Sequence, residues 1–151
     1  MAIIHQEISI SAPVAKVYGA LASADQIGTW WDQQKEVRTS RGLVLEHDPG
    51  PEHGVVRLRV VGLVPDKRVE WECISTHPKS SPASAWTGTR FIFELAVRTE
   101  SAGVGRDQVR TTTVGFRQVG FDDRSEFLQA NITTWGQALH KLKQVVESPP
   151  R

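Results

Sequence analysis

The C-terminal part of the sequence constrains the fold most, because its apolar residues recur at helical spacing after a long stretch without it. They are separated by steps of four and three, at Leu128, Ile132, Trp135, Leu139, Leu142 and Val146. This spacing predicts one long amphipathic helix over 122–146, with Asp122 and Asp123 at its positive N-terminal end and two prolines after it. A helix with a single apolar face requires a second layer that covers this face.

Most of the remaining chain alternates between apolar and polar residues, as half-buried β-strands do. The first strand is predicted at 3–11, and two later strands carry the inner rows Phe91, Phe93, Leu95, Val97 and Thr112, Val114, Phe116. Apolar residues also recur at helical spacing after Pro13 and near 24–28. This spacing predicts two short helices after the first strand. We therefore expect an α+β fold, in which a curved antiparallel sheet of about six to seven strands wraps around the C-terminal helix.

A hairpin near the middle of the chain indicates which residues face outward. Its turn is predicted at 64–67, which sets Arg59 opposite Glu72 and Leu63 opposite Arg68. Alternation then places Arg59, Glu70 and Glu72 on one side, and the apolar residues of both strands on the other. Opposite charges across a hairpin are typical of a solvated outer face, so we interpret Glu70 and Glu72 as structural rather than catalytic.

Length and charge limit the classes of function. The 151 residues predict one domain over 1–151, with an ordered core at about 3–146 and a tail at 147–151. The net charge of +1 does not favour a nucleic-acid partner, and no apolar run is long enough for a membrane span. The lone cysteine excludes an intramolecular disulfide, and no charged-then-apolar leader follows Met1, so we expect a cytoplasmic protein.

Several segments together resemble the START-like, or SRPBCC, superfamily: ISAPVAKVYGAL, the WW pair, VGLVPDKRVEWEC, WTGTRFIFEL, TTTVGF, VGF and WGQALHKLK. Within it, the sequence is similar to the branch related to the C-terminal domain of the activator of the ninety-kilodalton heat-shock-protein ATPase. The resemblance covers about residues 3–146 and implies a helix-grip fold with a deep, mostly apolar cavity. The superfamily includes lipid and hormone carriers, polyketide aromatases and cyclases, and chaperone-binding domains. This branch has no invariable catalytic set, so the resemblance implies no catalytic residues.

Ten residues are candidates for lining such a cavity: Trp30, Trp31, Trp71, Trp86, Phe91, Phe93, Val114, Phe116, Asn131 and Trp135. Most of them lie on inner rows and would also form a core without a ligand. The adjacent Trp30 and Trp31 follow the second short helix, and we expect their side chains to point in different directions. Trp86 is expected to begin a strand. Asn131 interrupts the apolar helix face, where its amide would bond a ligand, a backbone carbonyl or a loop side chain such as Thr87.

The sequence contains no motif for metal binding or nucleophilic catalysis. The five histidines are dispersed, and neither Cys-x-x-Cys nor His-Glu-x-x-His occurs. The segment HDPGPEH at 47–53 is interpreted as an exposed turn that holds ligand residue types by chance. Cys73 is interpreted as a buried, inert thiol. We therefore predict no cofactor, no metal and no catalytic residues.

The first functional hypothesis is binding of a small hydrophobic or aromatic molecule, lipid-like or polyketide-like, in an internal cavity. One alternative is an enzyme similar to polyketide cyclases or aromatases, which requires titratable groups that face the cavity. Another alternative is an interaction module similar to the chaperone ATPase activator, which requires an exposed apolar or strongly charged patch. A homodimer and a chaperone partner are both left open.

Overall fold

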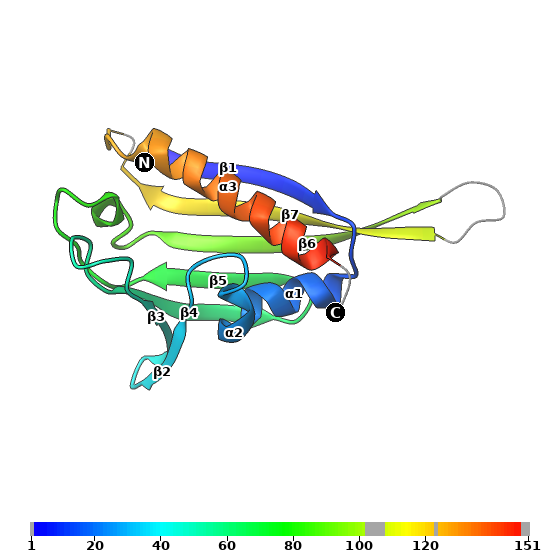
Figure 1. Ribbon diagram of the computed structural model, residues 1–151, viewed down its shortest axis with the longest axis horizontal. Helices are drawn as coiled ribbons and strands as arrows, with labels where there is room; N and C mark the ends of the chain where they lie inside the picture. Colours follow the sequence, from blue (N-terminus) through cyan, green and yellow to red (C-terminus); the bar gives the residue numbers. More distant parts are fainter. Residues whose placement is uncertain (1, 102–107, 123, 149–151) are drawn as a thin grey trace.

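The fold is one curved antiparallel sheet with three helices packed across its inner face (Figure 1). The computed structural model describes residues 2–101, 108–122 and 124–148. Within these residues the seven strands follow the order β1-β7-β6-β5-β4-β3-β2. The strands are β1 (Ala2–Ile10), β2 (Lys35–Thr39), β3 (Gly42–His47), β4 (Val56–Val64), β5 (Arg68–Cys73), β6 (Arg90–Ser101) and β7 (Gln108–Phe121). The helices are α1 (Val14–Ala22), α2 (Ala24–Ile27) and α3 (Leu128–Glu147), with a 3₁₀ turn η1 (Pro82–Ala85).

This architecture confirms the α+β fold predicted from the hydrophobic patterns, and it is the helix-grip fold that the family resemblance implies. In Figure 1, α3 lies along β1, β7 and β6, while α1 and α2 cover the region of β4 and β5. The inner face of the first strand is as predicted, since Ile4 and Ile10 are buried and His5, Glu7 and Ser9 are exposed. Because each strand contributes one apolar face and α3 contributes one apolar stripe, the core lies between the sheet and the helices.

The C-terminal helix begins later than predicted, at Leu128 rather than at residue 122. The Asp122 side chain accepts a bond from the Arg124 backbone N–H at 3.0 Å, and the Ser125 hydroxyl accepts one from Phe127 at 3.1 Å. These local side-chain bonds offer the backbone a turn in place of a helix, which hydrophobic spacing does not reveal. Asp123 lies outside the described residues. The helix spans roughly 30 Å at 1.5 Å per residue.

The central hairpin follows the predicted register at one end only. Arg59 pairs with Glu72 as expected, but Leu63 pairs with Val69 instead of Arg68. The register shifts between Val60 and Gly62, where β4 contains one extra residue. Such a bulge displaces every pair beyond it by one position, and simple alternation does not show where it falls.

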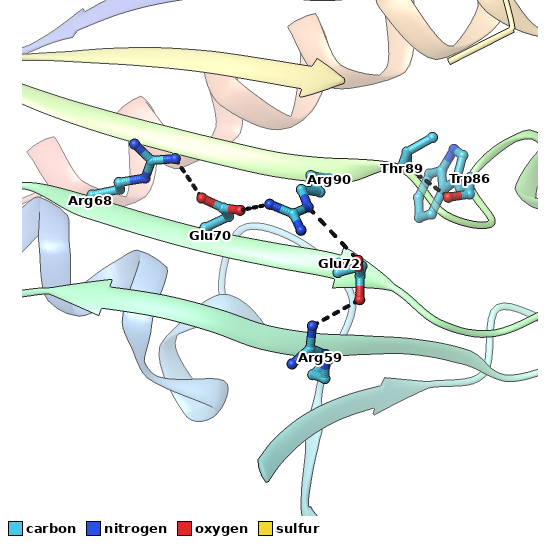
Figure 2. A network of polar contacts seen from close by, with 7 residues as sticks. All are labelled: Arg59, Arg68, Glu70, Glu72, Trp86, Thr89 and Arg90. Carbon is cyan, nitrogen blue, oxygen red and sulfur yellow. Dashed lines mark hydrogen bonds and ion pairs between the residues drawn. The ribbon is translucent and has the colours of Figure 1, made fainter. Parts of the chain in front are cut away.

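The outer face of β5 carries a network of charged side chains. Figure 2 shows Glu70 between Arg68 and Arg90, with Nη–Oε distances of 2.5 and 3.2 Å, and Glu72 bonded to Arg59 at 3.0 Å. The structural interpretation of both glutamates is thereby supported, since Trp71 between them points into the core. The prediction that Glu70 lies on a solvated face is wrong. The two arginines cover its side chain, and the residue is only 6% exposed.

Replacing Glu70 with alanine is expected to lower the free energy of unfolding by about 1–2 kcal/mol, because two arginines lose their carboxylate partner while keeping partial access to solvent. Urea unfolding followed by far-UV circular dichroism would measure the loss. Glu36→Ala is the matched control, because Glu36 is exposed on β2. Equal stabilities of the two variants would contradict a structural role for the network.

Candidate functional site

The predicted cavity residues lie together, and their rings pack against one another. Trp31 lies at the centre of this aromatic cluster, with its ring centroid 6.0 Å from that of Trp71, 6.1 Å from Trp86 and 5.1 Å from Trp135. Further ring contacts connect Trp30, Phe91, Phe93 and Phe116 to the cluster, and Val114 belongs to the same buried core. The aromatic side chains themselves therefore occupy much of the space between the sheet and α3.

The two adjacent tryptophans stack, so the expectation that they point in different directions is wrong. Their centroids are 6.2 Å apart, with an angle of 22° between the ring planes. Both backbone N–H groups bond to the Ile27 carbonyl, which holds the two residues in one tight turn after α2. Trp30 is 4% exposed and its Nε1 donates to the Ala20 carbonyl at 2.8 Å. Trp31 is only partly buried, and it is the indole that reaches the surface.

A closed ring of hydrogen bonds fixes Trp86 at the edge of the cluster. Trp86 Nε1 donates to Asn131 Oδ1 at 2.9 Å, and Asn131 Nδ2 donates to Gln118 Oε1. Gln118 Nε2 donates to Thr89 Oγ1 at 3.0 Å, and Thr89 Oγ1 donates to the Trp86 carbonyl at 2.7 Å, the bond drawn in Figure 2. Trp86 follows η1 and does not begin a strand, which corrects the sequence prediction.

The hydrogen-bond ring also shows which groups the Asn131 side-chain amide contacts. Its carbonyl oxygen accepts from Trp86, a loop side chain as one alternative from the sequence expected, although not Thr87. Its amide nitrogen donates to Gln118. The Thr87 hydroxyl donates to the Ser75 carbonyl instead. Gln118 was missed, although it continues the inner row of β7 two residues after Phe116, where a fully buried amide requires partners.

A pocket opens beside the aromatic cluster, between η1, the loop after α2 and the end of β3. It has a volume of about 340 Å³. Trp31 and Trp86 form part of its wall together with Val56 and Pro82, and Thr134 on α3 lies at its border. The titratable residues of the wall are Asp32, His47 and His53. Of the ten predicted cavity residues, Trp31 and Trp86 therefore line this pocket.

His47 is the most constrained polar group of the pocket. It is the last residue of β3 and is 6% exposed, so its assignment to an exposed turn was wrong. Its Nδ1 lies 3.0 Å from Gln34 Oε1, and its Nε2 lies 3.5 Å from Asp32 Oδ2. Burial lowers the pKa of His47, although the carboxylates of Asp32 and Asp48 act in the opposite direction. Burial therefore favours the uncharged form of the ring.

Two further histidines, His53 and His77, connect two loops near the pocket. His53 Nδ1 lies 2.6 Å from the hydroxyl of Ser81, which also caps η1. His77 Nδ1 donates to the His53 carbonyl at 2.8 Å, and its Nε2 accepts from Ser75 Oγ at 2.8 Å. Both serines are buried, so these contacts hold the loops before β4 and after β5 together.

The two remaining groups of chemical interest lie in the interior. Trp135 Nε1 is buried and has no hydrogen-bond partner within the described residues, which leaves one donor of the aromatic cluster unpaired. Cys73 is 1% exposed, and burial raises the pKa of its thiol, in agreement with an inert cysteine. Residues 2–101, 108–122 and 124–148 contain no group of three or more histidine, cysteine or acidic side chains arranged to hold a metal ion.

No helix of the described part of the chain is long and apolar enough to cross a membrane.

Comparison with known proteins identifies relatives by structure. No protein-family model and no curated protein matches the chain. The dimeric Aha1 protein from Colwellia psychrerythraea is 25% identical, with a TM-score of 0.71 over 97% of both chains. A protein from Mesorhizobium loti is 18% identical, with a TM-score of 0.73 over 99% of this chain and 100% of that chain. CalU16 from Micromonospora echinospora is 15% identical, with a TM-score of 0.64 over 99% of this chain and 75% of that chain.

In this chain two short helices follow the first strand and a long helix ends the described part of the chain. The similarity spans nearly the whole length of the Colwellia and Mesorhizobium proteins, so it concerns the whole fold described here and not one motif. The resemblance noted in the sequence is thereby confirmed, and the chain has the START-like, or SRPBCC, helix-grip fold in its Aha1-like form.

Proposed function

We propose that the protein binds a small, flat aromatic or hydrophobic molecule in the pocket beside Trp31 and Trp86. The observation that carries this proposal is the pair of partly buried indoles in the wall of a 340 Å³ pocket, accompanied by a few polar groups. Ligand sites combine apolar and aromatic walls with a small number of placed polar side chains, and their volumes start at about 300 Å³.

The packing of the interior narrows the class of ligand. The rings of the aromatic cluster occupy the region behind the pocket, which disfavours a long acyl chain and favours a compact ring system. Burial of about 200 Å² of apolar surface would contribute about 5 kcal/mol before the costs of association are subtracted. Trp86 enters the complex with its indole already fixed by Asn131, which reduces the entropy lost on binding.

Two neighbouring threonines on α3 allow a matched test of the pocket. Both are exposed, but only Thr134 is part of the pocket border. Thr134→Trp is expected to weaken binding of 2-methoxynaphthalene by about tenfold or more, because the added indole occupies the space of the ligand. Thr133→Trp should leave the affinity unchanged. Isothermal titration calorimetry would measure both, and equal affinities of the two variants would contradict this location of the site.

One observation favours the alternative that the protein is an enzyme. A cyclase-like reaction requires titratable groups at the ligand, and the Asp32–His47 pair lies in the pocket wall. A binding protein returns its ligand unchanged, whereas an enzyme alters its mass or its bonding. Mass spectrometry and NMR of the ligand recovered after incubation would separate these two functions.

A second copy of the chain is the partner that the comparisons support best. The Colwellia relative was solved as a dimer, and it matches this chain over nearly its whole length. We therefore extend the proposal to a homodimer.

A further inference from the structure

We infer that His47 makes the pocket selective for aromatic ligands that carry a hydroxyl group, with the imidazole Nε2 as the acceptor of the hydroxyl proton. This inference rests on the proposed binding of an aromatic molecule beside Trp31 and Trp86, and it assigns a specific recognition role to a residue outside the aromatic cluster.

The hydrogen-bond partners of Gln34 fix the orientation of its side-chain amide. Gln34 is 4% exposed, and its Nε2 donates to the Asp32 backbone carbonyl at 2.7 Å. A carbonyl oxygen only accepts hydrogen bonds, so the amide nitrogen must face it. The amide oxygen Oε1 then faces His47 Nδ1 at 3.0 Å. Gln34 thus presents an acceptor to the imidazole.

The orientation of Gln34 in turn determines which nitrogen of the His47 imidazole carries the proton. Because Gln34 Oε1 accepts, His47 Nδ1 must carry the proton. In the uncharged ring Nε2 then has a free lone pair. Its polar contact within the described residues is Asp32 Oδ2 at 3.5 Å, beyond the usual range of 2.7–3.2 Å for a hydrogen bond. Two acceptors face each other there, so the wall of the pocket lacks a donor at this point.

The pocket wall beside the imidazole matches an aromatic ligand that carries a hydroxyl group. Both His47 and Asp32 line the pocket, and the Trp31 ring lies edge-on to the imidazole, with centroids 4.9 Å apart. A ring system packed beside Trp31 therefore lies next to the imidazole. A hydroxyl on that ring supplies the missing donor, whereas a methyl ether of the same shape does not. The difference between the two compounds isolates this hydrogen bond.

Protonation of His47 would remove the acceptor. The charged ring donates from Nε2, and Asp32 would then accept this proton. Since burial keeps the pKa of His47 below its ordinary value of 6.5, the hydroxyl preference should be complete at pH 7.5 and decline as the pH falls below 6.5. The other titratable groups around the ring and its pocket are Asp48, His53, His77, Lys35 and Glu46.

The experiment compares 2-naphthol with 2-methoxynaphthalene by isothermal titration calorimetry at pH 7.5. The wild-type protein should bind 2-naphthol about three- to tenfold more tightly, the range that one net hydrogen bond supplies. His47→Phe keeps an aromatic ring without an acceptor, and it should bind both compounds equally. His140→Phe, at an exposed histidine on α3, should retain the wild-type preference.

Asp32→Asn provides a second variant with little risk to folding, because Asp32 is exposed. Its amide can donate to His47 Nε2 and occupy this acceptor. The ratio of the affinities for 2-naphthol and 2-methoxynaphthalene should therefore fall toward one. Equal binding of the two compounds to the wild-type protein would overturn the role of His47 and leave the proposed function standing. A preference that survives in His47→Phe would also overturn it. Binding of neither compound would defeat both proposals.

Discussion

Trp71→Ala should lower the free energy of unfolding by about 3–5 kcal/mol, the range for removing a buried aromatic side chain. Trp71 is 1% exposed and is the ring of β5 on which the aromatic cluster rests. Its centroid lies 6.0 Å from that of Trp31 and 5.0 Å from that of Phe93. A domain of this size has a total stability of about 5–15 kcal/mol, so the variant would be close to unfolding.

Urea unfolding followed by far-UV circular dichroism is the suitable measurement, because the substitution itself changes tryptophan fluorescence. Val97→Ala is the control on the neighbouring strand β6, where the side chain is 54% exposed. That variant should differ from wild type by no more than about 0.5 kcal/mol. A loss below about 1 kcal/mol for Trp71→Ala would mean that the cluster collapses around the gap and contributes little to stability.

Asn131→Leu should cost about 2–4 kcal/mol, although leucine is apolar and of similar size. The substitution leaves the Trp86 N–H and the Gln118 carbonyl oxygen without partners at a buried site. Each buried polar group without a partner costs about 1–3 kcal/mol. Thermal unfolding monitored at 222 nm would report this as a lower midpoint temperature.

A double-mutant cycle with Trp86→Phe separates this effect from a change in packing. Phenylalanine removes the indole donor, so Asn131→Leu then leaves one fewer group unpaired. The cost of Asn131→Leu should be smaller by about 1 kcal/mol in the Trp86→Phe background. Additive losses would show that the hydrogen bond between the two residues contributes nothing to stability.

The spacing of apolar residues predicted those features of the fold that depend only on which face of a single strand or helix is buried. The inner row of β7, the apolar stripe of α3 and the outward position of Glu70 all follow from spacing alone. The start of α3 and the bulge in β4 were missed. The first depends on local hydrogen bonds between side chains and the backbone, the second on one extra residue in the strand, and the apolar pattern shows neither.

The candidate site was predicted only where it coincides with the core. Aromatic residues on inner rows, together with the adjacent Trp30 and Trp31, identified the cluster, but the polar contacts join segments that are far apart in the chain. His47 bonds to Gln34 across 13 positions, and Asn131 bonds to Trp86 across 45. Such pairs form only when the loops are placed by the sheet, so no spacing rule indicates them.

The separation of the aromatic core from the polar wall of the pocket has a consequence for how this protein can diverge. Stability resides in rings carried by β5, β6, β7 and α3, whereas the polar wall comes from Asp32, His47 and the loops joined by His53 and His77. Substitutions in the polar wall can therefore exchange one ligand preference for another without a matching loss of folding. Proteins descended from such a domain would retain the scaffold while their ligand specificities diverge.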